Sequence, residues 1–289
     1  MKKVCIITLN YNGKKDTLNL LASLVNIEKK DFQIEIIVVD NGSLDDSVSA
    51  IESTYPSVTV LKNGRNLGFS GGNNVGIAYA LKTDASYLFL VNNDTLLKPS
   101  CLQILFRELE QNSKAGIAAP KIYFFQPSDT IWYAGGVIDW ANALCSHRGM
   151  DEKDKGVYNA IEETDFASGC AMMVKREVYD SIGMFDDDYF LYYEDADFNV
   201  RAKRAGWNIL YVPEAVIWHV NASTSGGAGS PLQEYYVTRN RLLFGFRYAS
   251  LRTKLALLRE TLRIYFSYPT RRKAIRDFYA GRFGKGEYI

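Results

Sequence analysis

The sequence predicts an α/β fold in which a mostly parallel central sheet is flanked by helices. Apolar, β-branched runs of strand length recur through the first hundred residues, and stretches of helical length separate them. Polar residues follow the end of three of these runs. Strands that alternate with helices favour a parallel sheet covered on both faces.

The predicted elements follow one another closely in the first hundred residues. Residues 4–9, 34–39, 58–61 and 87–91 are predicted strands, because each run is short and apolar. Residues 16–24 are a predicted helix, since Leu18, Leu21 and Leu24 recur at helical spacing. Further helices are predicted over residues 45–54, which have an acidic first turn, over 73–82 and over 99–112.

A later helix is predicted from Glu194 to residue 206, where acidic residues suit the positive end of the helix dipole. Asp197 and Arg201 stand four residues apart, so we expect an ion pair between them. Glu194 and Asp195 point about 100° apart on a helix and cannot share one role. One of these two carboxylates is therefore expected to face a pocket.

Composition and charge indicate a globular chain of 289 residues, either one large domain or one domain with a tail. Net charge is +1, but residues 239–289 hold thirteen Lys/Arg and three Asp/Glu, a surplus of ten, which leaves the remainder acidic by nine. The four scattered cysteines show no metal-site or disulfide spacing and are expected to be reduced thiols of a cytosolic protein. No secretion signal or apolar stretch of membrane-spanning length is found.

Polar side chains follow three predicted strands at their carboxyl ends. They are Asn10, Tyr11 and Asn12; Asp40 and Asn41; and Asn92, Asn93 and Asp94. One such end is typical of a turn. Three ends along one edge of a parallel sheet favour a polar ligand, because ligands of such sheets bind beyond the carboxyl ends of the strands.

The glycine-rich segment "NLGFSGGNNVG", residues 66–76, leaves two interpretations open. Its glycines allow the backbone to approach a phosphate closely, or they form a flexible loop that begins a helix. The segment lacks the Lys-Ser/Thr pair of a P-loop. It also does not follow the first strand, where a dinucleotide fingerprint would lie.

His219 ends an apolar run just before the glycine-rich "SGGAGS", residues 225–230. It is either a metal ligand or an ordinary core histidine. Arg239 and Arg241, in "YYVTRNRL", either contact phosphates or lie on the solvated face of an amphipathic helix.

The chain resembles glycosyltransferase family 2 of the GT-A fold, in particular its bacterial rhamnosyltransferase-like branch. The matching segments, in order, are "NYNG" at 10–13, "VVDNGS" at 38–43, "NLGFSGGNNVG" at 66–76, "LVNNDT" at 90–95, "ASGCAMMVKREVYDSIGMFDDDYFLYYEDADFNVRAKRAGW" at 167–207, "VPEAVIWH" at 212–219 and "YYVTRNRL" at 235–242. The resemblance implies a catalytic domain over residues 1–245, with a nucleotide-binding half at 1–115 and an acceptor half at 116–245. A basic helical extension would follow at 246–289.

The resemblance also implies roles for individual residues. Asp195 would be the catalytic base, and Asp94 with His219 would bind a divalent metal, Mg²⁺ or Mn²⁺. Donor-binding roles fall on Tyr11, Asp40, Asn66, Gly72, Asn73, Asn92, Asn93 and Arg239, and the sugar or acceptor pocket would include Ser168, Gly169 and Glu194. Asn92 stands where the family's DxD motif has its first aspartate, so one carboxylate for the metal is missing.

The implied activity is inverting transfer of a sugar from dTDP-rhamnose or a UDP-sugar to a hydroxyl of a glycan or lipid-linked glycan, in bacterial surface polysaccharide synthesis. The alternatives are an inactive nucleotide-sugar-binding protein of the same fold and a nicotinamide-dependent oxidoreductase. The oxidoreductase would require GxGxxG after the first strand, where this chain has "NYNG". No nucleic-acid partner is expected.

The basic tail leaves two interpretations open. Leu251, Leu255, Leu258 and Leu262 recur at helical spacing. Either this stripe packs on the catalytic domain, or the helix contacts an anionic membrane surface from the cytoplasmic side as a peripheral protein. In the second interpretation Arg271, Arg272, Lys273 and Arg276 are the expected lipid contacts.

Overall fold

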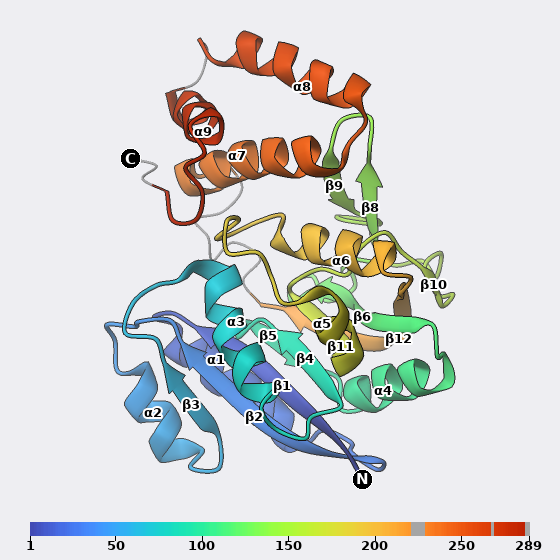
Figure 1. Cartoon of the computed structure of the whole chain (residues 1–289). Coiled ribbons are helices and arrows are strands. Elements are labelled where there is room, and N and C mark those ends of the chain that lie inside the picture. Colours follow the sequence, from blue (N-terminus) through green and yellow to red (C-terminus); the bar gives the residue numbers. More distant parts are fainter. Residues whose placement is uncertain (221–228, 267–268, 287–289) are drawn as a thin grey trace.

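The computed structural model describes residues 1–220, 229–266 and 269–286 of the chain. A twisted sheet with flanking helices forms the lower part of the molecule in Figure 1. Above it lie three helices from the end of the chain, α7 (Pro231–Tyr248), α8 (Leu251–Ile264) and α9 (Pro269–Tyr279). Residues 225–228 of the segment "SGGAGS" lie outside the described residues.

The central sheet contains strands from both halves of the chain. Its members are β1 (Lys2–Asn10), β2 (Phe32–Asp40), β3 (Thr59–Lys62), β4 (Tyr87–Val91), β5 (Thr95–Leu97), β6 (Ala115–Phe124), β7 (Ile131–Tyr133), β10 (Glu162–Glu163), β11 (Ala171–Lys175) and β12 (Asn208–His219). Their order is β10-β12-β6-β11-β4-β1-β2-β3, with β5 paired to β12 and β7 paired to β6. β8 (Gly136–Asp139) and β9 (Leu144–His147) form a separate antiparallel pair.

The predicted α/β sheet is confirmed, and its strand directions differ between the two halves. β4, β1, β2 and β3 are parallel, as the alternation of strands and helices predicts. β11 runs antiparallel to both β4 and β6, while β12 is parallel to β6 and antiparallel to β5. The whole sheet is therefore mixed. An apolar run carries no information on direction, so the second half could not be oriented from its sequence.

The helices of the catalytic region lie close to their predicted positions. They are α1 (Lys14–Val25), α2 (Ser47–Thr54), α3 (Gly68–Ala80), α4 (Cys101–Gln111), α5 (Arg176–Ile182) and α6 (Glu194–Arg204). α3 begins five residues before its predicted start at residue 73. α2 begins after Asp45 and Asp46, so the predicted acidic first turn precedes the helix.

The glycines of α3 serve packing. Gly68 has a φ of +79°, and a Cβ there would lie 2.5 Å from Phe190. A Cβ on Gly72 would lie 2.5 Å from Leu9, and one on Gly76 would lie 2.5 Å from Ile7. The glycines therefore let α3 approach β1 closely. The flexible-loop interpretation of residues 66–76 is wrong, because an ordered helix occupies most of the segment.

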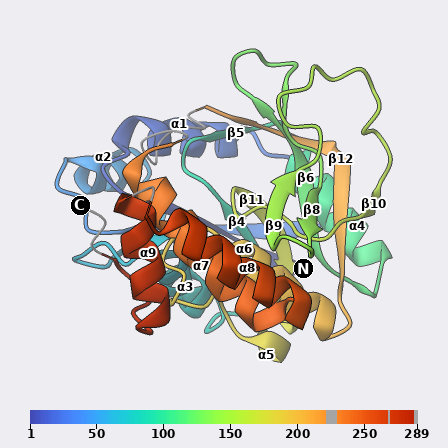
Figure 2. The same ribbon diagram turned by 90° about the horizontal axis from the view of Figure 1, so that it is seen from above.

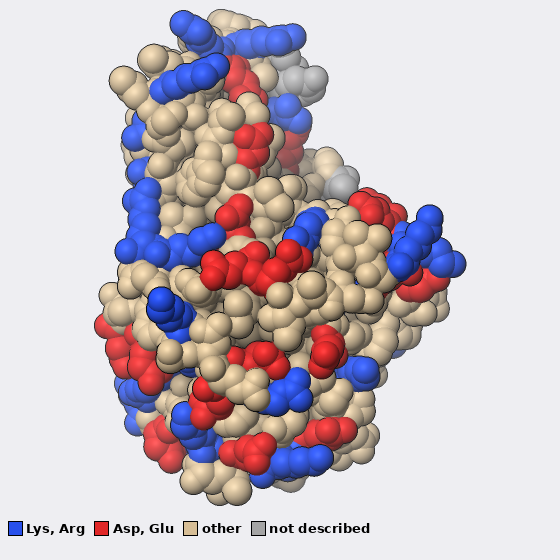
Figure 3. Space-filling view, turned by 90° about the vertical axis from the view of Figure 1, so that its right-hand side faces the viewer, with Lys and Arg blue, Asp and Glu red and all other residues tan. Residues whose placement is uncertain are grey.

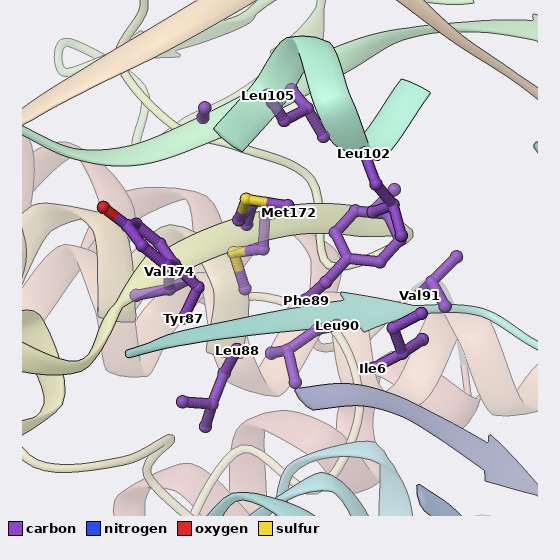
Figure 4. Close-up of a cluster of buried hydrophobic side chains, with 14 of the residues drawn as sticks. Ile6, Tyr87, Leu88, Phe89, Leu90, Val91, Leu102, Leu105, Met172 and Val174 are labelled. Carbon is purple, nitrogen blue, oxygen red and sulfur yellow. The ribbon is translucent and has the colours of Figure 1, made fainter. Parts of the chain in front are cut away.

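The core lies on both faces of the central strands. In Figure 4, Phe89 of β4 points toward Leu102 of α4, and Leu88 points to the opposite face. These three side chains are fully buried. This burial on both faces explains why the β4 sequence is uniformly apolar and does not alternate.

The C-terminal helices form their own apolar layer. α7 runs through the predicted boundary at residues 245 and 246, so the helical region begins earlier than expected. Leu242 and Phe244 of α7, Leu257 of α8 and Ile275 of α9 belong to one buried cluster. Among the described residues, no helix is both long and apolar enough to cross a bilayer. All four cysteines are free, as expected.

Candidate active site

The carboxyl ends of β1, β2 and β4 form one polar network. The parallel register places Asn10 opposite Asp40, and Asn10 Nδ2 donates to Asp40 Oδ1 at 2.9 Å. The Thr17 hydroxyl donates to Asn10 Oδ1 at 2.8 Å and accepts from Asn93 Nδ2 at 2.9 Å. The structure thus brings the polar ends of three strands together. Tyr11, beside this network, is 48% exposed.

A second network lies between β2 and the start of α3. Asn41 Nδ2 donates to Asn66 Oδ1 at 3.2 Å and to the Gly68 carbonyl at 3.0 Å. Asn41 Oδ1 accepts from the Leu67 amide at 3.0 Å. Asn66 therefore shapes the turn that precedes α3. Its predicted contact with the nucleotide stays a prediction.

Two predicted donor contacts on α3 are corrected. Gly72 faces Leu9 of β1, so its missing side chain makes room for packing. Asn73 is 2% exposed, and its Nδ2 donates to the Phe69 carbonyl at 2.9 Å within the helix. The first amides of α3 are also occupied, because Phe69 N donates to the Phe190 carbonyl at 2.6 Å. The end of α3 is therefore closed to a phosphate.

Asp94 and His219 meet because β5 pairs with β12. The antiparallel register places Thr95 opposite His219, and the Val220 amide donates to the Asp94 carbonyl at 2.7 Å. His219 Nε2 lies 3.1 Å from Asp94 Oδ1. Trp132 packs edge-on against the imidazole, with ring centroids 4.8 Å apart. Residues 125 positions apart in the sequence thus form one buried pair.

The Asp94–His219 pair has donor atoms suited to a divalent metal. Imidazole nitrogen and carboxylate oxygen are both ligands that Mn²⁺ accepts. His219 Nδ1 is buried and has no hydrogen-bond partner among the described residues. Within residues 1–220, 229–266 and 269–286, no group of three or more His, Cys, Asp or Glu side chains surrounds such a site. The protein therefore fits the metal as part of a coordination sphere that a nucleotide would complete.

Asp195 lies at the start of α6 and faces the segment before β11. Its Oδ2 accepts from the Gly169 amide at 2.9 Å, and its Oδ1 accepts from the Ala196 amide at 2.7 Å. Asn199 holds the two segments together, because its side chain both donates to and accepts from the backbone of Ala167, at 3.0 and 3.1 Å. The predicted neighbours Ser168 and Gly169 thus lie beside the predicted base.

Cys170 follows Gly169, whose amide contacts Asp195, and lies next to the end of β4. The Asn92 amide donates to the Cys170 carbonyl at 2.8 Å. Burial and the charges of both Asp94 and Asp195 raise the pKa of the Cys170 thiol well above its ordinary value. The charges of Asp94 and Asp195 thus both contribute to the electrostatic environment of this buried thiol.

The two neighbouring carboxyls at the α6 start have different environments. Burial raises the pKa of Asp195, although the amides of Gly169 and Ala196 oppose the shift. Glu194 is 4% exposed, and its Oε2 has no hydrogen-bond partner among the described residues. Burial and the adjacent Asp195 raise the pKa of Glu194 well above its ordinary value. Glu194 is thus enclosed, and burial disfavours its charged form; its place in the sugar or acceptor pocket stays a prediction.

A strained loop before α6 sets the position of Asp195. Phe190, Tyr192 and Tyr193 have φ values of 62°, 68° and 72°, a conformation that bulky side chains rarely adopt. Asn240 of α7 holds this loop, because its Nδ2 lies 2.8–2.9 Å from the carbonyls of Tyr189, Leu191 and Tyr192. Phe190 also stacks on Tyr236 of α7 at 5.2 Å. α7 therefore fixes the loop that delivers the predicted base.

The predicted phosphate contact of Arg239 is wrong, and so is its place on a solvated face. Arg239 is fully buried and donates to the carbonyls of Asp188, Tyr189 and Gly284 at 2.7–3.0 Å. Arg241 is likewise engaged, with Glu260 at 2.8 Å and the Asn142 carbonyl at 2.9 Å. Both arginines hold the C-terminal helices to the rest of the chain. The expected ion pair of Asp197 with Arg201 is confirmed at 2.7 Å.

Asn240→Ala is expected to lower kcat at least about tenfold, with little change in donor KM. The variant removes the side chain that holds three loop carbonyls, so Asp195 should lose its fixed position. Buried carbonyls left without a donor should also cost about 1–3 kcal/mol of folding free energy. Steady-state kinetics and thermal unfolding check both effects. Asn208→Ala, which loses one exposed contact with Glu163, is the matched control. Equal losses in kcat for both variants would contradict this role of Asn240.

The parallel strands β4-β1-β2-β3, the mixed second half and the polar edge define a GT-A type nucleotide-diphospho-sugar transferase fold. The chain aligns with the crystal structure of GalNAc-T7 with UDP, GalNAc and Mn²⁺, with a TM-score of 0.64 and 14% identity over 93% of this chain and 58% of that one. This likeness concerns the fold. The chain belongs to glycosyl transferase family 2, whose family model matches residues 4–183. It is a glycosyltransferase of the rhamnosyltransferase-like branch.

Two curated relatives are similar over most of their length. One is the N-acetylglucosaminyl-diphospho-decaprenol L-rhamnosyltransferase of Mycobacterium tuberculosis (strain CDC 1551 / Oshkosh), 25% identical over 76% of this chain and 77% of the relative. The other is the dTDP-rhamnosyl transferase RfbF of Shigella flexneri, 24% identical over 82% of this chain and 78% of the relative. Both names specify rhamnosyl transfer.

Proposed function

We propose that this protein is an inverting glycosyltransferase that uses dTDP-rhamnose, or a UDP-sugar, to glycosylate a hydroxyl of a lipid-linked glycan in surface polysaccharide synthesis. The single observation that carries the mechanism is the Asp195 carboxylate held by the Gly169 amide. We place it in one site with the Asp94–His219 pair, because Cys170, which follows Gly169, accepts a hydrogen bond from the Asn92 amide at the end of β4. The names of the relatives support the donor and the acceptor.

Asp195 accepts the proton of the acceptor hydroxyl while the acceptor oxygen forms its bond to the anomeric carbon. The bond from that carbon to the diphosphate oxygen breaks, and the nucleoside diphosphate leaves with the electron pair. A single displacement inverts the anomeric configuration. Glu194 is buried, so it is not placed to act as a second nucleophile. This difference between the two carboxyls supports inversion.

Asp94 and His219 would hold a divalent metal, Mg²⁺ or Mn²⁺, whose charge stabilises the departing diphosphate when bound. Asp40, with Asn10 fixed beside it, would position the base of the nucleotide, and exposed Tyr11 would cover it. Asn92 and Asn93 border the same strand end. We assign residues 1–230 to catalysis and the helices from α7 onward to support and attachment.

Transfer of a radiolabelled sugar tests the proposal. Purified protein is incubated with labelled dTDP-rhamnose or UDP-sugars and a short-chain N-acetylglucosaminyl-diphospho-lipid, and the glycolipid product is separated and its anomeric configuration determined. We expect product from dTDP-rhamnose with inverted configuration. A retained configuration would contradict the single displacement.

A thermal-shift panel with the same donors separates an enzyme from an inactive binder. A donor present at 100 times its Kd stabilises the folded state by about 2.7 kcal/mol. A donor that raises Tm without any transfer to the acceptor would favour the inactive nucleotide-sugar-binding alternative. The nicotinamide alternative has no support, since the chain belongs to glycosyl transferase family 2.

A further inference from the structure

The outward side of α8 carries an exposed apolar stripe. We define the leucine face as Leu251, Leu255, Leu258 and Leu262, whose exposed fractions are 73, 48, 40 and 65%. Phe266, just beyond the helix, is 78% exposed. The interpretation in which this stripe packs on the catalytic domain is therefore wrong. Exposed leucines in a continuous row indicate a surface made for a partner.

The helix is held from the side opposite the leucine face. Thr253, Leu257 and Thr261 are buried at 4, 1 and 3% exposure. At about 100° per residue they lie across the helix axis from the four leucines. Thr253 Oγ1 donates to the Trp140 carbonyl at 2.9 Å, and Ser250 caps the first turn by accepting from the Thr253 amide. α8 is thus a fixed helix that presents its leucines outward.

Basic side chains border the leucine face. Arg252, Arg259 and Arg263 are exposed and lie along one side of the row at helical spacing. They make no ion pair among the residues that the structure describes. The one acidic residue of α8, Glu260, pairs with Arg241 of α7 at 2.8 Å, away from the leucine face, and its side chain is 41% exposed. The outward half of α8 therefore combines leucines and arginines without an acidic side chain.

The leucine face lies at one end of the molecule. α8 is the helix farthest from the parallel sheet in Figure 1, and in the view from above it lies in front with α7 and α9 (Figure 2). Basic side chains lie at the uppermost edge in Figure 3, with acidic side chains just below them, and both kinds are interspersed over the rest of this face. Because α8 lies at this end, a flat partner can reach its exposed leucines.

We propose that the leucine face of α8 docks on an anionic lipid surface, with the leucines between the headgroups and Arg252, Arg259 and Arg263 on lipid phosphates. An amphipathic helix with a basic border is the usual form of an in-plane membrane contact. Its 14 residues span about 21 Å, so it lies along the surface. A second copy of the chain fits less well, because two leucine faces would bring arginines against arginines.

The structure changes which basic residues make this contact. Arg271 pairs with Glu234 at 2.8 Å, and Arg272 and Arg276 bond to the backbone and hydroxyl of Tyr265. These side chains join the C-terminal helices to one another. Because the described arginines of α8 have no ion pair, our proposal places the lipid contact on them rather than on α9.

Vesicle co-sedimentation of the whole chain tests the proposal without an activity assay, so its result is independent of the proposed function. At low salt we expect binding to phosphatidylglycerol-containing vesicles and little binding to neutral phosphatidylcholine vesicles. A triple Arg252→Gln, Arg259→Gln, Arg263→Gln variant should bind about 100-fold more weakly. A Leu255→Gln, Leu258→Gln double variant should also lose binding, since both the apolar and the charged groups contribute. Lys29→Gln, Lys30→Gln, Lys82→Gln, with the same charge change on exposed residues elsewhere, is the matched control.

Each outcome decides the proposal once circular dichroism shows that the variants fold. Loss of binding in both α8 variants, with the control unchanged, supports the leucine face as the lipid contact. Equal binding to neutral and anionic vesicles, or an equal loss in the control, overturns it. Dimerisation that the leucine substitutions abolish, without vesicle binding at low salt, would assign the face to a second copy of the chain.

Discussion

Asp195→Asn is expected to lower turnover by about 10²–10⁴-fold, with the fold and donor binding retained. The carboxylate accepts hydrogen bonds from the amides of Gly169 and Ala196, and these bonds fix its orientation at the start of α6. Asparagine keeps the size of the side chain, and its single oxygen can still accept one of the two N–H groups, so the fold should be retained although one hydrogen bond is lost. The amide cannot take a proton from the acceptor hydroxyl. Steady-state transfer and donor-induced thermal shift together measure the two effects.

The pH profile adds a signature specific to a base. Burial raises the pKa of Asp195, so the carboxyl stays protonated to a higher pH than an ordinary aspartate at about 3.9. A protonated carboxyl cannot act as a base. The turnover of the wild-type protein should therefore fall as pH is lowered through this raised pKa. The residual turnover of Asp195→Asn should not show this fall at low pH.

Glu194→Gln is the matched control, because Glu194 is buried, burial raises its pKa, and glutamine keeps the size of the side chain without a charge. We expect its turnover to stay within about threefold of the wild-type value. Near wild-type turnover in Asp195→Asn together with a large loss in Glu194→Gln would move the base by one residue.

Local sequence signals predicted the parts of the site that depend on strand ends. Asn10, Asp40 and Asn93 follow apolar runs, and parallel strands bring their carboxyl ends to one edge. The pairing of His219 with Asp94 depends on the antiparallel contact of β5 with β12. No apolar run specifies that contact. The resemblance to a known family was needed to connect these two residues.

Burial explains the predictions that failed. A glycine-rich helix start can serve a ligand or close packing, and the Cβ contacts of Gly72 with Leu9 decide for packing. Arg239 could not be told from a phosphate ligand, because its partners are backbone carbonyls of a loop some 50 residues earlier. The sequence contained no pattern that marked Asn199 or Asn240 as supporting residues of the site. Each supports backbone groups, and such roles become visible only when the loop conformation is known.

Asp94→Ala is expected to lower turnover at least about 100-fold, far more than Asn92→Ala. A divalent metal contributes several kcal/mol to stabilisation of a leaving diphosphate, and each 1.36 kcal/mol changes the rate tenfold. Asp94 supplies the charged oxygen that lies 3.1 Å from His219 Nε2. Asn92 offers only a neutral amide side chain, and its backbone N–H donates a hydrogen bond to the Cys170 carbonyl. The loss of one neutral ligand should therefore cost much less than the loss of the carboxylate.

Metal titration separates this role from a structural one. After treatment with EDTA, turnover of the wild-type protein should fall, and Mn²⁺ or Mg²⁺ should restore it. Asp94→Asn keeps the shape of the side chain and a hydrogen-bond acceptor for His219, so it isolates the charge. It should require a higher metal concentration for half-maximal turnover, because carboxylate is the stronger ligand for these ions. Full turnover after thorough chelation would exclude the metal role.

Without a metal, another group would have to stabilise the departing diphosphate. Arg239 and Arg241 already bind backbone carbonyls and Glu260, so this stabilisation would have to come from backbone N–H groups and the asparagines at the end of β4.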